Sequence, residues 1–483
     1  MKKFLSILLV LLMFAIPLAS CADTPDDPGK DTGNAGNTGD TNVDVPDVLE
    51  IPENVDYEGY EFTILNHNQQ NYNYALIDFD EPSDDPYENA LYLRNLAVEE
   101  LLNITISETS PGAASDVYSA FKTSVDANTN DYDICFNNLP YSCTATGNGL
   151  CYELDMFEYI KLNKSWWNKD CTDQLALGNM HYMISGDISL SDKECIWALY
   201  FIKKLITEHN LENPYDLVNN NQWTWDKLHE MAATVANDEN GNSKMDSNDI
   251  WGLCTHGENF PAMWESAGLT LVSLNNDGIP EVNWNSEEFV TVFEGIVDIM
   301  GDKECVNWTT EPDGISDAVA FISTALKESK TLFGTEVIAF VRSYRDNEED
   351  FGILPFPKYN SDVERYNSYI AVNSFVMTIG NNCSELERTG VVVEALAAKG
   401  TEILTPAYYD GQLSSKFARD EESGEMLDII FENRCYDLGV FFNWGSAYSS
   451  LMSTTANPAS LYASVSKKMN REIEKAFEKL GLY

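Results

Sequence analysis

Few residues in this chain have the types and spacing that catalysis requires. His229-Glu230 begins like the zinc-binding H-E-x-x-H motif, but no second histidine follows one turn later. Ser119 and Lys122 have S-x-x-K spacing without the partner motifs of the enzymes that use it. A pair of glycosidase carboxylates could lie among the 78 Asp and Glu residues, because only their separation in space identifies such a pair. The sequence therefore favours a protein that binds over one that catalyses.

One acidic stretch has the spacing of a calcium-binding loop. The side chains at its positions 1, 3, 5, 9 and 12 are Asp238, Asn240, Asn242, Asp246 and Asp249. Position 7, which supplies only a backbone carbonyl, is Lys244. Position 6, which needs glycine for a sharp turn, is Ser243, while the glycine is Gly241. We expect either a structural Ca²⁺ site or an acidic surface turn that has lost or weakened its ion.

Aromatic side chains recur near predicted loops and element ends, often beside Asn, Asp, Glu or Arg. They are Trp166, Trp167, Trp264, Trp308, Tyr344, Tyr369 and Trp444. Sugars present apolar C–H faces and a rim of hydroxyls, so a sugar site needs flat aromatic rings flanked by planar polar groups. Any single ring can instead belong to the core, and we assign Trp225 and Trp251 to it.

The N-terminus has the order of a bacterial lipoprotein signal. Two lysines precede an apolar run, and small residues precede Cys21. We predict that residues 1–20 are a signal peptide and that acylated Cys21 anchors the protein to the extracellular face of the cytoplasmic membrane. A plain N-terminal membrane anchor is the alternative. Residues 21–55, including the lipidated cysteine, are predicted to be a disordered tether, because residues 22–54 are polar and lack aromatic residues.

The net charge of −48 is extreme, and no lysine or arginine lies between Lys30 and Arg94. Such a charge repels nucleic acid and anionic lipid surfaces, so we expect no nucleic-acid partner. Neutral solutes and cations are compatible with it.

Nine cysteines remain once Cys21 is assigned to lipid, and they are spread through a long chain. None has the C-x-x-C spacing of a zinc site. We expect most of them to be small buried side chains, although an exported location would permit one or two disulfides.

The elements that position these residues begin with a strand over Tyr60–Leu65 and a polar loop over 67–70. Asp85 then caps a helix whose apolar residues Ala90, Leu93, Ala97 and Leu101 share one face. Strands over 103–106 and 132–136 follow, and this order predicts a parallel α/β sheet. Ligands bind at the carboxyl ends of such strands, here at loop 67–70 and at Asn137-Asn138.

Farther along, residues 197–202 are a compact apolar run, and the pattern predicts strands over 332–341, 351–357 and 374–379. Helices are expected over 224–236, 286–300 and 384–399, the last ended by Gly400. The C-terminus is predicted to be helical, with Met469, Ile473, Phe477 and Leu480 on one face.

The ordered set of motifs resembles the extracellular solute-binding proteins of family 1, the sugar receptors of ABC importers. The resemblance includes the lipobox and tether, 132–136, 213–217, 223–228, the acidic loop before Trp251-Gly252-Leu253, and the strand ending at Leu354-Pro355. Residues 184–192, 405–409 and 417–423 are similar to a lipoprotein subgroup of anaerobic Gram-positive gut bacteria.

The resemblance implies an α/β fold with two lobes that close like a clamshell, and chain crossings at a hinge. Lobe 1 would contain 56–185 and about 369–405, and lobe 2 would contain 186–368 and about 406–483, with C-terminal helices packing across both. With the aromatic loops, the predicted ligand-binding residues are His67, Asn68, Gln69, Asn137, Asn138, Trp167, Trp264, Glu265, Arg342, Tyr344 and Trp444.

The resemblance implies a monomeric, membrane-anchored receptor that captures a carbohydrate, most simply an oligosaccharide, and delivers it to an ABC permease. Two alternatives remain at this point. A peptide receptor of the same fold would line its cleft with groups for charged termini. A secreted carbohydrate-active hydrolase would bring two carboxylates together.

Overall fold

The first sheet brings together strands that are far apart in the chain. The computed structural model describes residues 47–67, 75–79, 81–308, 317–344, 349–413 and 421–482. The sheet order is β12-β3-β1-β2, with β1 Tyr60–Asn66, β2 Ile104–Thr109, β3 Ile134–Asn138 and β12 Phe375–Thr378. Strand β1 pairs in parallel with β2 and with β3, which confirms the predicted α/β sheet. Strand β12 runs antiparallel to β3.

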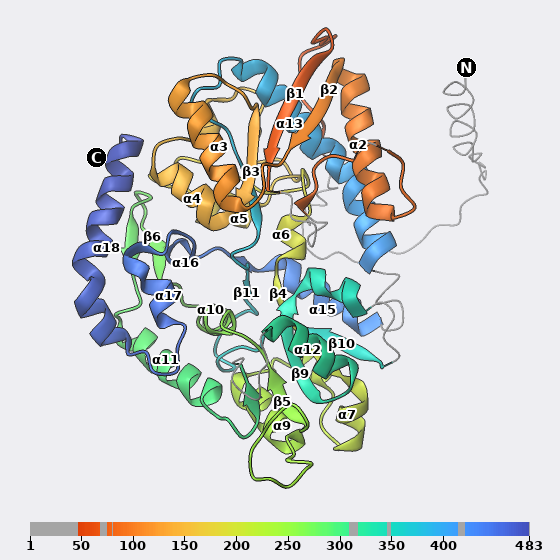
Figure 1. The fold of residues 1–483 in the computed structure, drawn as a ribbon, viewed down its shortest axis with the longest axis vertical. Helices are drawn as coiled ribbons and strands as arrows, with labels where there is room; N and C mark the ends of the chain where they lie inside the picture. Colours follow the sequence, from red (N-terminus) through yellow and green to blue (C-terminus); the bar gives the residue numbers. More distant parts are fainter. Residues whose placement is uncertain are drawn as a thin grey trace, which may run out of the picture. The chain divides into compact units, whose positions relative to one another are not determined.

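Helices that follow these strands in the chain, or lie between them, pack beside the sheet (Figure 1). They include α2 Pro86–Leu102, α3 Ala114–Ala127, α4 Leu139–Gly147 and α13 Leu386–Lys399. Asp85 caps α2 as predicted, accepting hydrogen bonds from the backbone N–H groups of Tyr87 and Glu88. The predicted apolar face of α2 is wrong, because Leu93 and Leu101 are 44% and 42% exposed. The buried face is instead formed by Tyr87, Ala90, Leu91, Arg94, Asn95, Val98 and Leu102.

Gly400 does not end α13 by adopting a left-handed conformation, since its φ is −61°. A Cβ atom at this position would lie 1.8 Å from the carbonyl oxygen of Asp187. The glycine is therefore required for close backbone packing, and the chain continues beyond it in wide helical turns to Leu413.

The second sheet has the order β10-β4-β9-β5-β8. Its strands are β4 Trp197–Ile202, β5 Trp251–Cys254, β8 Val306–Asn307, β9 Thr331–Val337 and β10 Phe351–Leu354. Neighbouring helices include α7 Lys203–Glu208, α9 Trp225–Val235, α11 Glu287–Met300, α12 Ala318–Lys327 and α15 Glu421–Glu432 (Figure 1). The strand predicted over 332–341 ends at Val337, where a 3₁₀ helix over Ile338–Tyr344 begins.

The chain passes between the two sheets more than once: after β3 it forms β4, and after β10 it returns as β12. The connecting segments bond to one another. Strand β11 (Ser368–Tyr369) pairs in parallel with β13 (Arg434–Cys435), and Ile196 forms a bridge with Ile370. Arg434 Nη1 lies 2.8 Å from Oδ2 of buried Asp192. These contacts hold the crossing segments of the two-lobed fold side by side.

The C-terminal helix α18 (Pro458–Leu480) contacts α4 beside the first sheet and α11 beside the second. Met469, Ile473 and Phe477 are buried on it, as their spacing predicts. The remaining elements are α5 Lys169–Gln174, α6 Ser191–Glu194, α8 Pro214–Asn219, α10 Asn259–Ser266, α16 Leu438–Phe442, α17 Ala447–Leu451, β6 Val272–Leu274, β7 Pro280–Val282 and two short 3₁₀ helices, Leu154–Met156 and Trp444–Ser446.

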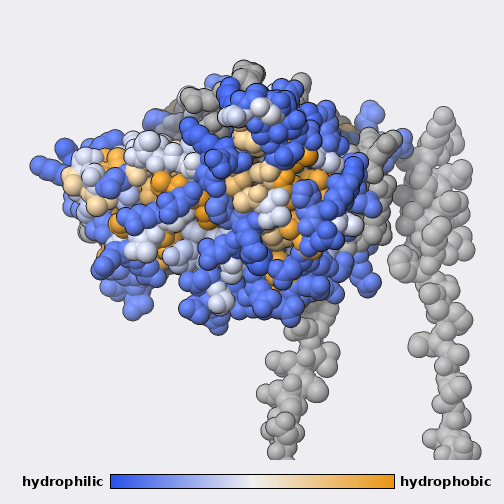
Figure 2. Space-filling model, turned by 90° about the horizontal axis from the view of Figure 1, so that it is seen from below, coloured by the Kyte–Doolittle hydropathy of each residue, from blue (hydrophilic) through white to orange (hydrophobic). Residues whose placement is uncertain are grey.

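The interior contains the residues expected there. Trp225 and Trp251 are buried, and seven of the nine described cysteines are buried as free thiols. The visible surface in Figure 2 is largely hydrophilic, in keeping with the net charge of −48.

Part of the segment that the sequence assigned to the tether packs on the body of the protein. Residues 47–55, expected to belong to the tether, contact the first lobe through Lys164, whose Nζ lies 2.7 Å from Glu50 and 3.4 Å from Asp47. The boundaries predicted for the two lobes stay a prediction.

Candidate functional site

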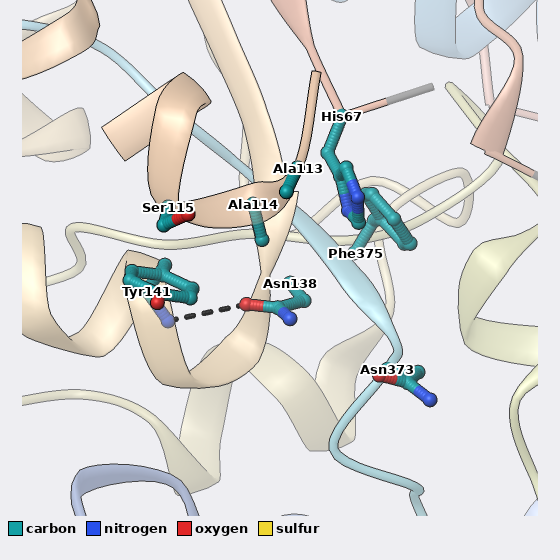
Figure 3. Close-up of a pocket in the computed structure, with 8 residues that line it drawn as sticks. All are labelled: His67, Ala113, Ala114, Ser115, Asn138, Tyr141, Asn373 and Phe375. Carbon is teal, nitrogen blue, oxygen red and sulfur yellow. Dashed lines mark hydrogen bonds between the residues drawn. The ribbon is translucent and has the colours of Figure 1, made fainter. Parts of the chain in front are cut away.

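A cavity of about 230 Å³ opens at one edge of the first sheet. Its lining residues are His67, Ala113, Ala114, Ser115, Asn138, Tyr141, Asn373 and Phe375 (Figure 3). The carboxyl ends of parallel β1 and β3 place His67 and Asn138 at this edge. Because β12 is antiparallel to β3, its first residue lies there too, and Phe375 is paired with Asn138.

His67 is the most unusual side chain of the cavity. It is only 5% exposed, yet among the described residues neither ring nitrogen has a hydrogen-bond partner. Its ring stacks on Phe375, with centroids 5.3 Å apart and planes inclined by 24°. Burial lowers the pKa of His67, so the neutral ring offers one N–H donor and one nitrogen acceptor. Two buried ring nitrogens without partners favour a ligand that can both accept and donate a hydrogen bond, as a hydroxyl group does.

Further donors come from helix starts. Ala114 and Ser115 begin α3, and the first N–H groups of a helix have no acceptor within it. Asn138 caps α4, its Oδ1 accepting from the backbone N–H of Tyr141 at 3.3 Å (Figure 3). Its side-chain NH₂ is therefore the group left for a ligand. Tyr141 adds an aromatic ring that packs beside Tyr118 at 5.9 Å.

No Asp, Glu, Lys or Arg lines the cavity among the described residues, although the chain carries 108 charged side chains, 30 basic and 78 acidic. The lining combines aromatic rings, amides and a neutral imidazole. This chemistry suits an uncharged, hydroxyl-rich ligand, because each polar group can pair with a hydroxyl and each ring with a C–H face.

The cavity is smaller than the ~300–1,000 Å³ typical of ligand pockets. A ligand longer than one small ring must therefore extend out of it.

Of the eleven predicted ligand-binding residues, the structure places His67 and Asn138 at the cavity. Asn68 and Gln69 lie outside the described residues, and so does the side chain of Arg342. Asn137 is 3% exposed, and its side chain bonds to the backbone instead of facing the cavity. Its Nδ2 donates to Ala114 O at 3.0 Å, and its Oδ1 accepts from Asn138 N at 2.9 Å.

Trp167 lies in the interior of the first lobe instead of on an accessible surface. Its Nε1 donates to Glu394 Oε2 at 3.1 Å, and Nε1 of Trp166 donates to Oε1 at the same distance. Burial raises the pKa of Glu394 to about 7, against the opposing effect of these donors and the Lys161 N–H. Both tryptophans thus fix a buried carboxyl group.

The aromatic residues predicted to bind the ligand from the second lobe are also buried in this structure. Trp264 is fully buried on α10 and packs on Phe289 at 5.9 Å. Tyr344 is 3% exposed, and Trp444 is 5% exposed and stacks on Phe442 at 4.3 Å. Glu265 is buried, and burial together with Asp437 raises its pKa. Large rings pack cores as readily as they bind sugars, and sequence does not distinguish the two.

The sequence did not predict the cavity residues at the start of α3, which are Ala113, Ala114 and Ser115, or those at the start of β12, which are Asn373 and Phe375. A loop following the second parallel strand was a detectable signal, since β2 ends at the same edge as β1. Asn373 and Phe375 were not detectable, because a sequence pattern does not show whether a strand is parallel or antiparallel.

The acidic turn over 238–249 is held by hydrogen bonds between its own carboxylates and its own backbone N–H groups. Asp238 accepts from the N–H groups of Gly241, Asn242 and Ser243, and Asp249 accepts from those of Glu239 and Asp246. Ser243 adopts φ 66°, the conformation for which position 6 requires glycine. Both carboxylates are satisfied by backbone donors, so the turn does not need an ion to complete its bonding.

The fold is that of the solute-binding proteins of ABC transporters. Solved structures that share it include a cyclic α-maltosyl-1,6-maltose binding protein from Arthrobacter globiformis, with a TM-score of 0.58, 13% identity, and coverage of 86% of this chain and 99% of that one. A maltose/maltodextrin-binding MalE domain from Bdellovibrio bacteriovorus, bound to maltotriose, has a TM-score of 0.54 and 14% identity, covering 86% and 100%.

A cyclo/maltodextrin-binding protein complexed with maltotetraose has a TM-score of 0.57 and 12% identity, covering 86% of this chain and 97% of that one. No protein-family model and no curated protein matches the sequence. Within the described part of the chain, no helix is long and apolar enough to cross a bilayer.

Proposed function

We propose that this protein is an extracellular receptor that captures a carbohydrate and delivers it to an ABC importer. The observation that carries the proposal is the uncharged lining of the cavity in a strongly acidic chain. The fold supports it, because the structural neighbours described above include proteins bound to maltotriose and maltotetraose.

The same lining argues against the two alternatives. A peptide receptor needs groups that pair with charged termini, and none lines the described cavity. A glycosidase needs two carboxylates beside the scissile bond, and no carboxylate lines it either. Binding without catalysis fits this chemistry best.

His67, Asn138 and the start of α3 would supply the hydrogen bonds to sugar hydroxyls, and the His67–Phe375 stack and Tyr141 would supply apolar faces. The cavity would hold one end of the ligand. Closure of the second lobe over the remainder would then complete the site, as in hinge-closing receptors generally.

Lipidation of Cys21 would anchor the receptor at the outer face of the cytoplasmic membrane, with two or more acyl chains giving stable attachment. The receptor would act as a monomer that docks on the permease subunits.

A ligand screen by thermal unfolding tests the proposal. A ligand that binds only the folded state raises stability by about 2.7 kcal/mol at a hundredfold excess over Kd. We expect a neutral oligosaccharide to raise Tm and short peptides to leave it unchanged. A rise with peptides and with no sugar would contradict the proposal.

A further inference from the structure

Three potential metal ligands of different types meet beside the second sheet. His229 lies on α9, and Asp302 and Cys305 lie in the turn between α11 and β8. His229 Nε2 is 2.8 Å from Asp302 Oδ2, and Cys305 Sγ is 3.4 Å from the same oxygen. The three atoms lie within 4.8 Å of one another, and this is the one such group of His, Cys, Asp or Glu found in the described part of the chain.

One glycine explains why the helix and the turn lie together. A Cβ atom on Gly252 would lie 2.3 Å from the carbonyl oxygen of Ala232, so glycine allows α9 to pack directly on β5. The N–H groups of Gly252 and Leu253 both donate to the carbonyl oxygen of Cys305, each at 3.0 Å. Strand β5 therefore fixes the helix that carries His229 and the turn that carries Cys305.

The Asp302 carboxylate is oriented by its own turn. Oδ1 accepts from the N–H of Glu304 at 3.1 Å, which turns Oδ2 toward His229 and Cys305. The backbone carbonyl of Asp302 accepts from Val306 N at 2.8 Å. Hydrogen bonds that orient a ligand in this way are typical of built metal sites.

We infer that His229, Asp302 and Cys305 bind one divalent transition-metal ion of the zinc type. Imidazole nitrogen, thiolate sulfur and carboxylate oxygen are the ligands that Zn²⁺ takes in proteins. One thiolate and one carboxylate balance the double positive charge. The Cys305 thiol releases its proton to solvent when the sulfur–metal bond forms.

The site has room for a fourth ligand from solvent. The His229 and Asp302 side chains are 35% and 30% exposed, whereas Cys305 is 2% exposed. The metal would thus lie near the surface, with the thiolate on its buried side and water completing a tetrahedral arrangement.

The chain contains a natural comparison. His181 Nδ1 lies 2.8 Å from Asp155 Oδ2, also near the surface, but no cysteine joins this pair in a three-residue group within the described residues. A histidine–aspartate pair alone therefore serves as an internal control for the contribution of the thiolate.

Titration of the full chain with Co²⁺, under reducing conditions and in detergent, tests the inference. We expect one equivalent to produce a thiolate-to-cobalt charge-transfer band that Zn²⁺ abolishes. Cys305→Ser should remove the band, and His229→Ala should weaken Co²⁺ binding at least tenfold. Cys383→Ser and His181→Ala should leave the band and the affinity unchanged.

Absence of the band in the wild-type chain would overturn the inference, as would a band of equal strength in Cys305→Ser. His229→Ala changes a partly exposed helix residue, so it remains informative if Cys305→Ser fails to fold. Far-UV circular dichroism of each variant without metal checks the fold.

Discussion

The buried carboxyl group of Glu394 makes the stability of the first lobe depend on pH in a predictable direction. Its two oxygens accept from Trp166 Nε1, Trp167 Nε1 and Lys161 N at 3.1 to 3.2 Å. Burial nevertheless raises the pKa from 4.5 to about 7. At about 1.36 kcal/mol per pH unit, this rise corresponds to about 3 kcal/mol.

The sign follows from proton linkage. Between pH 4.5 and 7 folded Glu394 holds a proton that the unfolded chain releases, so its contribution to the free energy of unfolding falls as pH rises. The contribution is complete below about pH 4.5 and lost above about pH 7. In Glu394→Gln this dependence disappears, because the amide does not titrate.

Urea unfolding of the wild type and of Glu394→Gln, followed by tryptophan fluorescence from pH 4.5 to 8, measures the effect. We expect the wild type to lose about 3 kcal/mol relative to the variant across this range. Glu425→Gln, an exposed change on α15, should track the wild type. Parallel curves for the wild type and Glu394→Gln would refute the reasoning.

Three further predictions concern single residues. Trp264→Ala should cost about 3–5 kcal/mol of stability because the ring is fully buried, and more than Trp308→Ala at a partly buried ring; equal urea midpoints would contradict this. Cys21→Ser should prevent lipidation, and an unmodified wild-type chain that retains residues 1–20 in intact-mass analysis would disprove the signal. If the acidic turn binds Ca²⁺, EDTA should lower Tm in the wild type but not in Asp238→Ala; identical melting curves with and without EDTA would leave only a surface turn.

The elements of the first sheet were predictable because local signals agree there. Asp85 and the following proline specify the start of α2, and the alternation before Asn66 specifies β1. The buried face of α2 was not predictable from apolar residues alone. Arg94 is fully buried there, donating to the carbonyl oxygens of Ile188 and Ile77 at 2.9 Å, and such long-range partners leave no local pattern.

The candidate site was predictable only where a strand end alone determines a position, as for His67 and Asn138. The contribution of Phe375 depends on β12 joining the sheet in antiparallel orientation from more than 200 residues away. The tryptophans were the least informative residues for locating the site. The sequence around Trp264 and Trp444 does not show whether the rings pack in the core, as they do here, or face a ligand.

We expect a neutral sugar to bind at the cavity, and the most direct test is titration of His67→Ala with the oligosaccharide that the screen identifies. Loss of the ring nitrogens should remove at least one hydrogen bond of about 1 kcal/mol, which weakens binding about fivefold or more. His209→Ala, at a histidine that follows α7 away from the cavity, should bind like the wild type. Wild-type affinity in His67→Ala, or no binding of any sugar by the wild-type protein, would contradict the claim.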